Sequence, residues 1–150
     1  MKHGTKPSFH GIRRIALDTN CFIYYIGGSP WSEKLAPIFS SIETGEISGV
    51  TSSLTLLETL VQPIRQKKRH LADLYRQAVM QFPHLTVRDV DTRIAYRSAE
   101  LRAEYPSLKS PDAIQLATGL IEEVSAFLTN DIRIPDIEMQ GLRIIRFEEL

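Results

Sequence analysis

Near the start of the chain, the sequence Ile15-Ala16-Leu17-Asp18-Thr19-Asn20 sets the architecture of the whole protein. Its first three residues form an unbroken apolar run, which is typical of a strand buried on both faces. The run ends abruptly in three polar residues, and residues 21–26 are predicted to form a short apolar helix. A buried strand followed at once by a helix is the first unit of a parallel sheet with helices on both faces.

The remaining sequence repeats this alternation of strands and helices. Further strands are predicted at residues 47–51, 85–87, 127–129 and 142–147, and further helices at 32–45, 54–68, 71–82, 91–105 and 110–124. We therefore predict an α/β fold with three α/β/α layers and a mostly parallel central sheet of about five strands. Residues 1–11 are predicted to be a flexible N-terminal arm, and residues 12–150 a single domain.

The composition excludes several classes of protein. Hydrophobic residues make up 43% of the 150 residues and charged residues 24%, which argues against a disordered chain. No apolar run approaches the roughly 18 residues of a membrane span, so we expect no membrane association. The first residues lack the apolar core of a signal peptide. A single cysteine, Cys21, forms no internal disulfide, which favours a reducing cytoplasm.

Charge is balanced overall but not along the chain. The 18 Lys and Arg residues equal the 18 Asp and Glu residues, which by itself disfavours a broadly basic nucleic-acid-binding protein. Residues 1–75 nevertheless carry a net charge of +3, and residues 76–150 one of −3. Four cations gather in one basic cluster, Arg65, Lys67, Lys68 and Arg69. This cluster is either a solvated helix end or a surface that faces phosphate groups.

Acidic residues occur where the strands of such a fold end. Asp18 directly follows the first strand, Asp131 follows the strand at 127–129, and Asp112 lies in the first turn of a helix. Glu58 lies one turn into the helix after the second strand. Each residue alone also suits a turn, a helix terminus or a solvated helix face. In a parallel sheet, however, the working site lies beyond the carboxyl ends of the strands, so the four should meet there.

A pocket with up to four negative charges is unstable unless protons or cations neutralise it. All four side chains are hard oxygen ligands, and such sites select Mg²⁺ or Mn²⁺ over Zn²⁺. The four histidines are scattered along the chain, which makes a zinc site a poor alternative. The residues therefore predict a magnesium-type metal site.

Four motifs in this order resemble the PIN-domain ribonuclease family, and most closely its short bacterial toxins of the VapC type. They are Leu17-Asp18-Thr19-Asn20, Leu57-Glu58-Thr59, Ser110-Pro111-Asp112-Ala113-Ile114-Gln115-Leu116-Ala117 and Leu128-Thr129-Asn130-Asp131. Each motif is weak alone, but the ordered set extends from about Arg14 to Phe147, which is nearly the whole chain. The resemblance implies a PIN-like fold.

The resemblance also implies roles for individual residues. Asp18, Glu58, Asp112 and Asp131 match the metal-binding and catalytic acids of the family, while Asn20 and Thr129 match its supporting polar residues. Asp136 is a second candidate for the fourth acid. The implied activity is a Mg²⁺-dependent (Mn²⁺ also suits) endoribonuclease, in which a metal-activated water hydrolyses an RNA phosphodiester. Neither the number of metal ions nor the general base (Asp112 or Glu58) follows from the sequence.

RNA recognition and partners complete what the resemblance implies. The basic cluster would contact the RNA backbone, and Trp31, Tyr24 and Tyr25 are candidates for stacking on bases, although packing is the commoner role of such aromatics. A toxin of a type II toxin–antitoxin system is expected to form a homodimer and to bind a cognate antitoxin protein. Exposed apolar residues on the paired helices between Cys21 and Ser41, or between Leu54 and Val79, are the interface candidates.

Other functions fit the sequence less well. A catalytically silent PIN-like module that binds RNA or protein is the alternative, and only the presence of all four acids argues against it. A receiver-type signalling domain needs adjacent acids at the first strand end, where only Asp18 stands, and a phosphatase of the Asp-x-Asp type has Asn20 in the second position. If the four acids hold metal, 18 cations face 14 remaining acids, so the neutral total still permits a polyanionic substrate.

Overall fold

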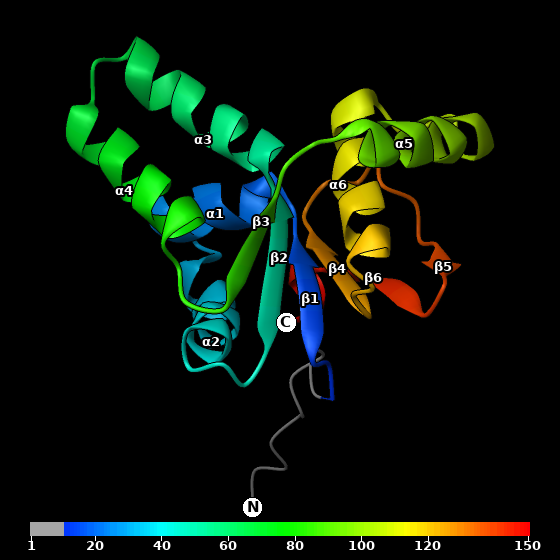
Figure 1. Ribbon diagram of the computed structural model, residues 1–150. Helices are drawn as coiled ribbons and strands as arrows, with labels where there is room; N and C mark the ends of the chain where they lie inside the picture. Colours follow the sequence, from blue (N-terminus) through cyan, green and yellow to red (C-terminus); the bar gives the residue numbers. More distant parts are fainter. Residues whose placement is uncertain (1–10) are drawn as a thin grey trace, which may run out of the picture.

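The computed structural model describes residues 11–150 and forms one sheet between two helical layers (Figure 1). The predicted arm, except for Gly11, lies outside the described residues. The strands are β1 (Arg14–Leu17), β2 (Ser48–Ser52), β3 (Leu85–Arg88), β4 (Ala126–Thr129), β5 (Glu138–Met139) and β6 (Leu142–Arg146). The helices are α1 (Thr19–Ile26), α2 (Ser32–Glu43), α3 (Ser53–Arg65), α4 (Arg69–Met80), α5 (Thr92–Glu104) and α6 (Ser110–Ile121), with a last 3₁₀ turn at Phe147–Glu149.

The sheet has the strand order β3-β2-β1-β4-β6-β5. All neighbouring strands are parallel except β5 and β6, which are antiparallel. The predicted three-layer α/β/α fold with a mostly parallel sheet is confirmed. The sheet has six strands rather than about five, because the sequence analysis missed β5. This strand is only two residues long, so it has no alternating pattern to detect, and a tight turn at Gly141 (φ +78°) connects it to β6.

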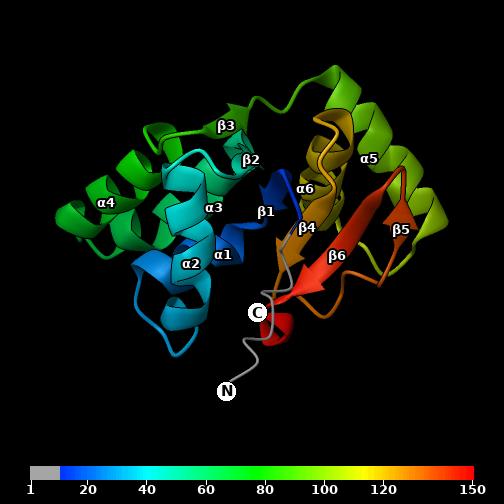
Figure 2. The same ribbon diagram turned by 90° about the horizontal axis from the view of Figure 1, so that it is seen from below.

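Strand β1 buries side chains on both faces of the sheet, as its unbroken apolar run predicts. Ile15 and Leu17 belong to the core beneath α1 and α2, whereas Ala16 between them belongs to the core beneath α5 and α6. Seen from below, helices α1–α4 lie on one side of the sheet and α5 and α6 on the other (Figure 2). The two cores fix the sheet between rigid layers, so the ends of its strands are held in place.

The helix boundaries agree with the sequence analysis to within a few residues, with one informative difference. In the sequence Ser110-Pro111-Asp112, Ser110 is the residue type expected at an N-cap, but the helix predicted over 110–124 already includes Ser110 and ends at Ile121. The Ser110 hydroxyl accepts a hydrogen bond from Arg102 (Nη1–Oγ 2.9 Å), while the carboxylate of Asp112 accepts from the backbone N–H of Lys109 (3.0 Å). Asp112 therefore caps the helix, which orients its side chain at the end of the sheet.

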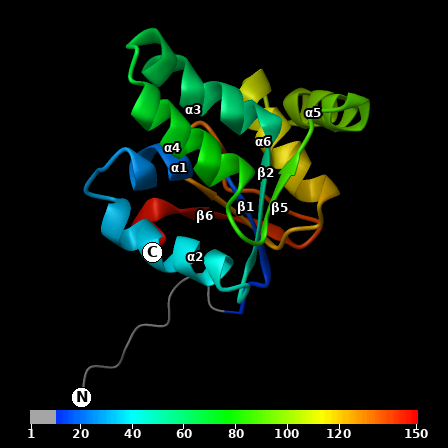
Figure 3. The same ribbon diagram turned by 60° about the vertical axis from the view of Figure 1, so that its left-hand side comes forward.

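The carboxyl ends of β1, β2 and β4 meet at one edge of the sheet, and α1 and α3 begin directly after two of them. The start of α6 lies at the same edge (Figure 1). Helices α3 and α4 run side by side as an antiparallel hairpin away from the sheet (Figure 3). Among residues 11–150, no helix is long and apolar enough to cross a membrane.

Candidate functional site

Asp18 is one of the two buried acids of the predicted set, with 7% of the residue exposed. It follows β1 directly and is the N-cap of α1, where its Oδ1 accepts from the backbone N–H of Thr19 (2.9 Å) and its Oδ2 accepts from the Thr129 hydroxyl (2.7 Å). Burial, with smaller contributions from the charges of Glu58 and Asp112, raises the pKa of Asp18 to about 6, although these two hydrogen bonds act to lower it. Asp18 therefore both caps α1 and belongs to an acidic cluster.

Asp112 lies at the start of α6 and is 5% exposed. Its pKa is raised, first by burial and then by the charge of Asp131, while the bond from Lys109 N–H opposes the shift. That bond uses Oδ2 alone, and Oδ1 faces Arg133 at 3.7 Å. Two acids at this edge, Asp18 and Asp112, thus hold their negative charge at a cost in free energy, as expected where carboxylates crowd together.

Asp131 lies in the loop after β4, and its neighbour Arg133 is its counter-ion. The Arg133 guanidinium bonds both carboxylate oxygens, with Nη2–Oδ2 at 2.6 Å and Nε–Oδ1 at 3.1 Å. The hydrogen bonds from Arg133 hold the pKa of Asp131 below its ordinary value. Sequence reasoning did not select Arg133, although a cation two residues after a candidate acid is a signal that could have revealed it.

Glu58 is half-buried on α3, and its Oε1 accepts a hydrogen bond from the Thr19 hydroxyl (2.8 Å). Thr19 is the residue directly after Asp18, so this bond holds the Glu58 carboxylate beside that of Asp18. The Glu58 charge accordingly contributes to the raised pKa of Asp18. The structure thus brings the four predicted acids into one neighbourhood. The charges of Glu58 and Asp112 raise the pKa of Asp18, and the charge of Asp131 raises the pKa of Asp112.

The two predicted supporting residues connect elements within this neighbourhood. Thr129 is fully buried, donates to Asp18 and accepts from the backbone N–H of Asp131 (3.0 Å), so its hydroxyl joins two of the acids. Asn20 accepts from the backbone N–H of Asn130 (Oδ1–N 3.4 Å) and so joins α1 to the loop after β4. The contacts of Thr129 with Asp18 and of Asn20 with Asn130 each join residues more than 100 positions apart, which only the folded chain brings together.

The arrangement suits a hard divalent cation in its chemistry, although it is not a closed cage. Among residues 11–150, no three Asp, Glu, His or Cys side chains lie in the arrangement of a preformed metal site. Arg133 is the cation between Asp131 and Asp112. Each carboxylate oxygen has two lone pairs, so the hydrogen bonds at Asp18 and Asp112 leave acceptor positions available. An all-oxygen donor set with two raised pKa values fits Mg²⁺ or Mn²⁺.

The loop that carries Asp131 is held from β6 by Arg146. Its guanidinium donates to the backbone carbonyl of Asp131 (Nη1–O 2.9 Å) and to that of Ile134. The second candidate for the fourth acid, Asp136, forms an ion pair with the same Arg146 (3.5 Å), and its side chain is largely exposed. The structure places Asp131, and not Asp136, against Asp112.

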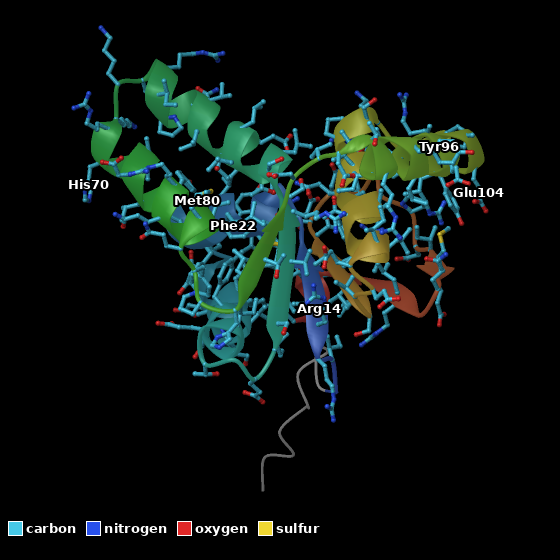
Figure 4. All side chains as sticks on the ribbon, in the orientation of Figure 1. Arg14, Phe22, His70, Met80, Tyr96 and Glu104 are labelled. Atoms are coloured by element: carbon cyan, nitrogen blue, oxygen red, sulfur yellow. The ribbon has the colours of Figure 1, made fainter. Side chains whose placement is uncertain are left out.

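The predicted RNA-contacting residues lie apart from the acids. The basic cluster forms the turn between α3 and α4, and it is exposed to solvent. His70, the next residue, is labelled at the outer end of this hairpin in Figure 4. Glu58 and Arg65 are seven residues apart on α3, so roughly 10 Å of helix separates the cluster from the nearest acid.

The aromatic residues considered for base stacking pack against other rings of the protein. Tyr25 stacks on Phe39 with ring centroids 4.2 Å apart, and Trp31 and Tyr24 both make edge-to-face contacts with Phe147. These contacts anchor the loop between α1 and α2 to the core. Packing is therefore the role that the structure gives to all three side chains.

A buried polar network behind the acids was also missed in the sequence analysis. Its members are Thr19, Thr51, Ser52, Thr55 and Gln115, all of them buried. The sequence spacing could have revealed two of these residues, because Thr55 precedes Glu58 by one helical turn and Gln115 follows Asp112 by one turn. Side chains at this spacing share a helix face, so the network lies directly beneath the acids.

Comparisons with known proteins were made for both sequence and fold. A family model described as PIN domain matches residues 15–138. The chain matches none of the curated proteins with which it was compared. Its fold is similar to a toxin-antitoxin complex from Klebsiella pneumoniae, with 27% identity and a TM-score of 0.61 over 78% of this chain and 86% of that one.

Two further solved structures share the fold at lower identity. VapBC2 from Rickettsia felis, bound to a DNA fragment from its promoter, has 19% identity and a TM-score of 0.67 over 89% of this chain and 98% of that one. DNA-bound VapBC from Salmonella typhimurium has 24% identity and a TM-score of 0.62 over 90% and 98% of the two chains. The similarity therefore extends over nearly the whole of each relative.

Proposed function

The chain belongs to the PIN domain family, and on that premise we propose that it is a Mg²⁺-dependent endoribonuclease, the toxin of a type II toxin–antitoxin system. The observation that carries the proposal is the convergence of four carboxylates at the carboxyl edge of the sheet. Burial and mutual repulsion raise the pKa values of Asp18 and Asp112, and a divalent cation would relieve this repulsion.

Asp18, Glu58, Asp112 and Asp131 are the residues that would hold the metal. When bound, the metal would offset charge that develops on the scissile phosphate and would lower the pKa of a nearby water molecule. Thr129 favours the ionised form of Asp18 and fixes its orientation by donating to Oδ2. Arg146 fixes the loop that presents Asp131. The raised pKa of Asp112 makes its carboxylate a stronger base than an ordinary aspartate, and Glu58 is the other candidate base.

Arg133 has a second role in this proposal. Its side chain is about half exposed at the margin of the acidic cluster, next to Asp131 and Asp112. A guanidinium in this position can bond a phosphate oxygen of the RNA with the same donors that it now uses for Asp131. The basic cluster between α3 and α4 would contact phosphates further along the strand.

The proposed protein partners follow from α3 and from the solved relatives. An apolar hollow of about 580 Å³ runs along α3 and is lined by Leu56, Leu57, Leu60, Val61 and Ile64. Leu57 and Ile64 are 59% and 63% exposed, which is unusual for large apolar side chains. Of the two predicted interface regions, we propose the helical pair between Leu54 and Val79 as the surface for a second toxin chain or a cognate antitoxin. The proposed site of action is the cytoplasm.

One observation favours the alternative of a catalytically silent PIN-like module that binds RNA or protein. Arg133 already neutralises Asp131, and the acids do not form a closed metal cage among residues 11–150. In that case the protein would bind RNA without any metal requirement. A titration with Mn²⁺ separates the two functions, because the silent module shows no binding at millimolar concentration.

The proposed function is tested by expressing the wild type and Asp18→Asn from an inducible promoter in a bacterium that lacks the cognate antitoxin, and by mapping RNA ends. Growth arrest and new RNA ends are expected only with the wild type. The purified wild type should cut RNA with Mg²⁺ and not with chelator. Asp131→Asn should lose this activity, whereas Asp136→Asn, a matched loss of one acid in the same loop, should keep it. A folded Asp18→Asn protein that cuts RNA at the wild-type rate would overturn the assignment of the site.

A further inference from the structure

The buried polar network consists of Thr19, Thr51, Ser52, Thr55 and Gln115 and connects the three helices that carry or follow the acids. Gln115 is 3% exposed on α6, and its amide donates to Thr19 Oγ1 on α1 (3.0 Å) and to Thr55 Oγ1 on α3 (2.8 Å). Its carbonyl oxygen accepts from the Ser52 hydroxyl (2.9 Å). A single side chain thus bonds to residues from the start of α1, the end of β2 and the first turn of α3.

The direction of the Gln115 amide is set by Ser52. The Ser52 oxygen accepts from the backbone N–H of Leu54 (3.2 Å) as the N-cap of α3, so its own proton is directed to Gln115 Oε1. That orientation turns both N–H groups of the amide toward the two threonines. Gln115 is therefore a donor, and not an acceptor, on the side that faces the acids.

The hydroxyl protons of Thr51 and Thr55 then each have one destination, while Thr19 Oγ1 lies near both Thr55 Oγ1 (3.2 Å) and Glu58. The Thr51 proton goes to the backbone carbonyl of Leu17 (3.0 Å), so Thr51 can only accept from Thr55 (2.7 Å). Thr55 therefore donates its hydroxyl proton to Thr51. Thr19 accepts from Gln115, and its proton is directed to Oε1 of Glu58 (2.8 Å). The chain of donors is thus directed outward, from the buried amide to the candidate ligand.

We propose that Gln115 is a positioning residue for the metal site, because it fixes Thr19 as a hydrogen-bond donor that holds the Glu58 carboxylate beside Asp18. The effect on metal binding rests on the proposed function, whereas the hydrogen-bond geometry of Gln115, Thr19 and Glu58 does not. A Gln115 without donors leaves Thr19 Oγ1 free to rotate its proton toward Thr55 or the backbone, and Glu58 loses its anchor. Partners that orient a ligand in this way contribute about 10- to 100-fold to metal affinity.

The test compares Gln115→Met with Thr118→Val in the full-length protein. Met retains the length of Gln without donors. Thr118 is also buried on the same helix, and within residues 11–150 its hydroxyl bonds only to Ile114 O (2.7 Å). Mn²⁺ affinity is measured by electron paramagnetic resonance of the free ion, with folding checked by circular dichroism. We expect Gln115→Met to weaken Mn²⁺ binding about tenfold and Thr118→Val to change it less than twofold.

The same comparison in a Glu58→Gln background tests whether Gln115 affects Mn²⁺ binding through Glu58. Gln115→Met should weaken Mn²⁺ binding no further there, because the ligand that Gln115 positions has already changed. An equal loss in both backgrounds, or an unchanged affinity in Gln115→Met alone, would overturn the inference. If Gln115→Met does not fold, Thr19→Val replaces it and should show the same loss, while Thr19→Ser should keep wild-type affinity; equal affinity in these two variants contradicts the inference.

A metal-free measurement keeps this inference separate from the proposed function. The Thr19 hydroxyl proton should be visible by NMR in the wild type as a slowly exchanging resonance, and it should be lost in Gln115→Met but retained in Thr118→Val. Its persistence in Gln115→Met would refute the positioning role, whether or not the protein binds metal. If the wild type binds no Mn²⁺ but Gln115→Met still loses this resonance, the proposed function is refuted and the positioning role of Gln115 is supported.

Discussion

The guanidinium of Arg133 forms a bidentate ion pair with the carboxylate of Asp131, in which Nη2 lies 2.6 Å from Oδ2 and Nε 3.1 Å from Oδ1. The same group lies 3.7 Å from Oδ1 of Asp112. One cation of the chain thus balances two of the four acids at the edge of the sheet. A divalent cation needs oxygens of the same two acids, so the guanidinium and the metal compete for them.

This competition predicts the effect of removing the guanidinium. Arg133→Ala should bind Mn²⁺ roughly three- to tenfold more tightly than the wild type, because the metal no longer displaces a cation from Asp131. The RNA cleavage rate should nevertheless fall if Arg133 contacts the phosphate. Arg76→Ala removes the same charge from the exposed face of α4 and should leave Mn²⁺ affinity unchanged. Weaker Mn²⁺ binding in Arg133→Ala would show that the two cations do not compete.

Asp18 predicts a dependence of stability on pH. Its pKa is raised from 3.8 to about 6, so the folded protein holds the proton more tightly than the unfolded chain. The stability that this provides is complete below pH 3.8 and is lost as the pH rises through about 6. Asp18→Asn, which remains a good N-cap, should therefore unfold like the wild type near pH 4 but be more stable by roughly 2–3 kcal/mol at pH 7.5.

Urea unfolding of the wild type and Asp18→Asn at a series of pH values measures this difference. A stability difference that stays constant from pH 4 to pH 7.5 would mean that Asp18 ionises normally in the folded protein. Saturating Mg²⁺ at pH 7.5 should remove most of the difference, since it stabilises only the wild-type carboxylate.

Removing the Thr129 hydroxyl should change both the stability of the protein and the pKa of Asp18. Thr129→Val removes the buried hydrogen bond to Asp18 Oδ2 and leaves the partly buried N–H of Asp131 without its acceptor, which should cost about 1–3 kcal/mol of unfolding free energy. It should also raise the pKa of Asp18 above its wild-type value, because this bond favours the ionised form. Thr129→Ser keeps the hydroxyl and should restore both. NMR titration of the Asp18 carboxyl carbon checks this, and an unshifted midpoint in Thr129→Val would contradict it.

Metal binding predicts a thermal shift. At a Mg²⁺ concentration tenfold above its Kd, the wild type should gain about 1.4 kcal/mol, which raises Tm by roughly 3–6 °C for a domain of this size. Asp112→Asn should lose this response, because it removes one of the proposed ligands. Asp73→Asn, on the exposed face of α4, should retain it. A thermal scan with Mg²⁺ and with chelator measures the shift, and an equal response in both variants would exclude Asp112 as a ligand.

The basic cluster between α3 and α4 predicts a salt-dependent contribution to RNA binding. In an Asp112→Asn background that prevents cleavage, Lys67→Gln with Lys68→Gln should reduce the slope of log affinity against log salt by up to about 1.4 for single-stranded RNA. Lys34→Gln, an exposed cation on α2, serves as the control. Fluorescence anisotropy at several salt concentrations measures the slopes. Unchanged slopes would leave the cluster as a solvated helix end, the other reading of these residues.

Much of the architecture could be predicted because it depends on local patterns. The apolar run in β1, the glycine and proline residues that end helices, and the spacing of apolar residues in α3 are each visible over a few positions. Strand β5 could not be predicted, because two residues carry no periodicity and their pairing with β6 depends on the turn at Gly141. The capping bond of α6 could not be assigned from the sequence, because Asp112, and not Ser110, accepts it.

The sequence by itself determined the layered fold and the identity of the four candidate acids, because strand ends and helix starts are local features and a parallel sheet gathers them at one edge. The tertiary structure alone decided how those acids are balanced. Arg133 at Asp131, Thr129 between Asp18 and Asp131, and the Gln115 network beneath Glu58 all depend on side-chain directions. Hydrogen bonds and ion pairs need an accuracy of a few tenths of an ångström, which only the packed core supplies.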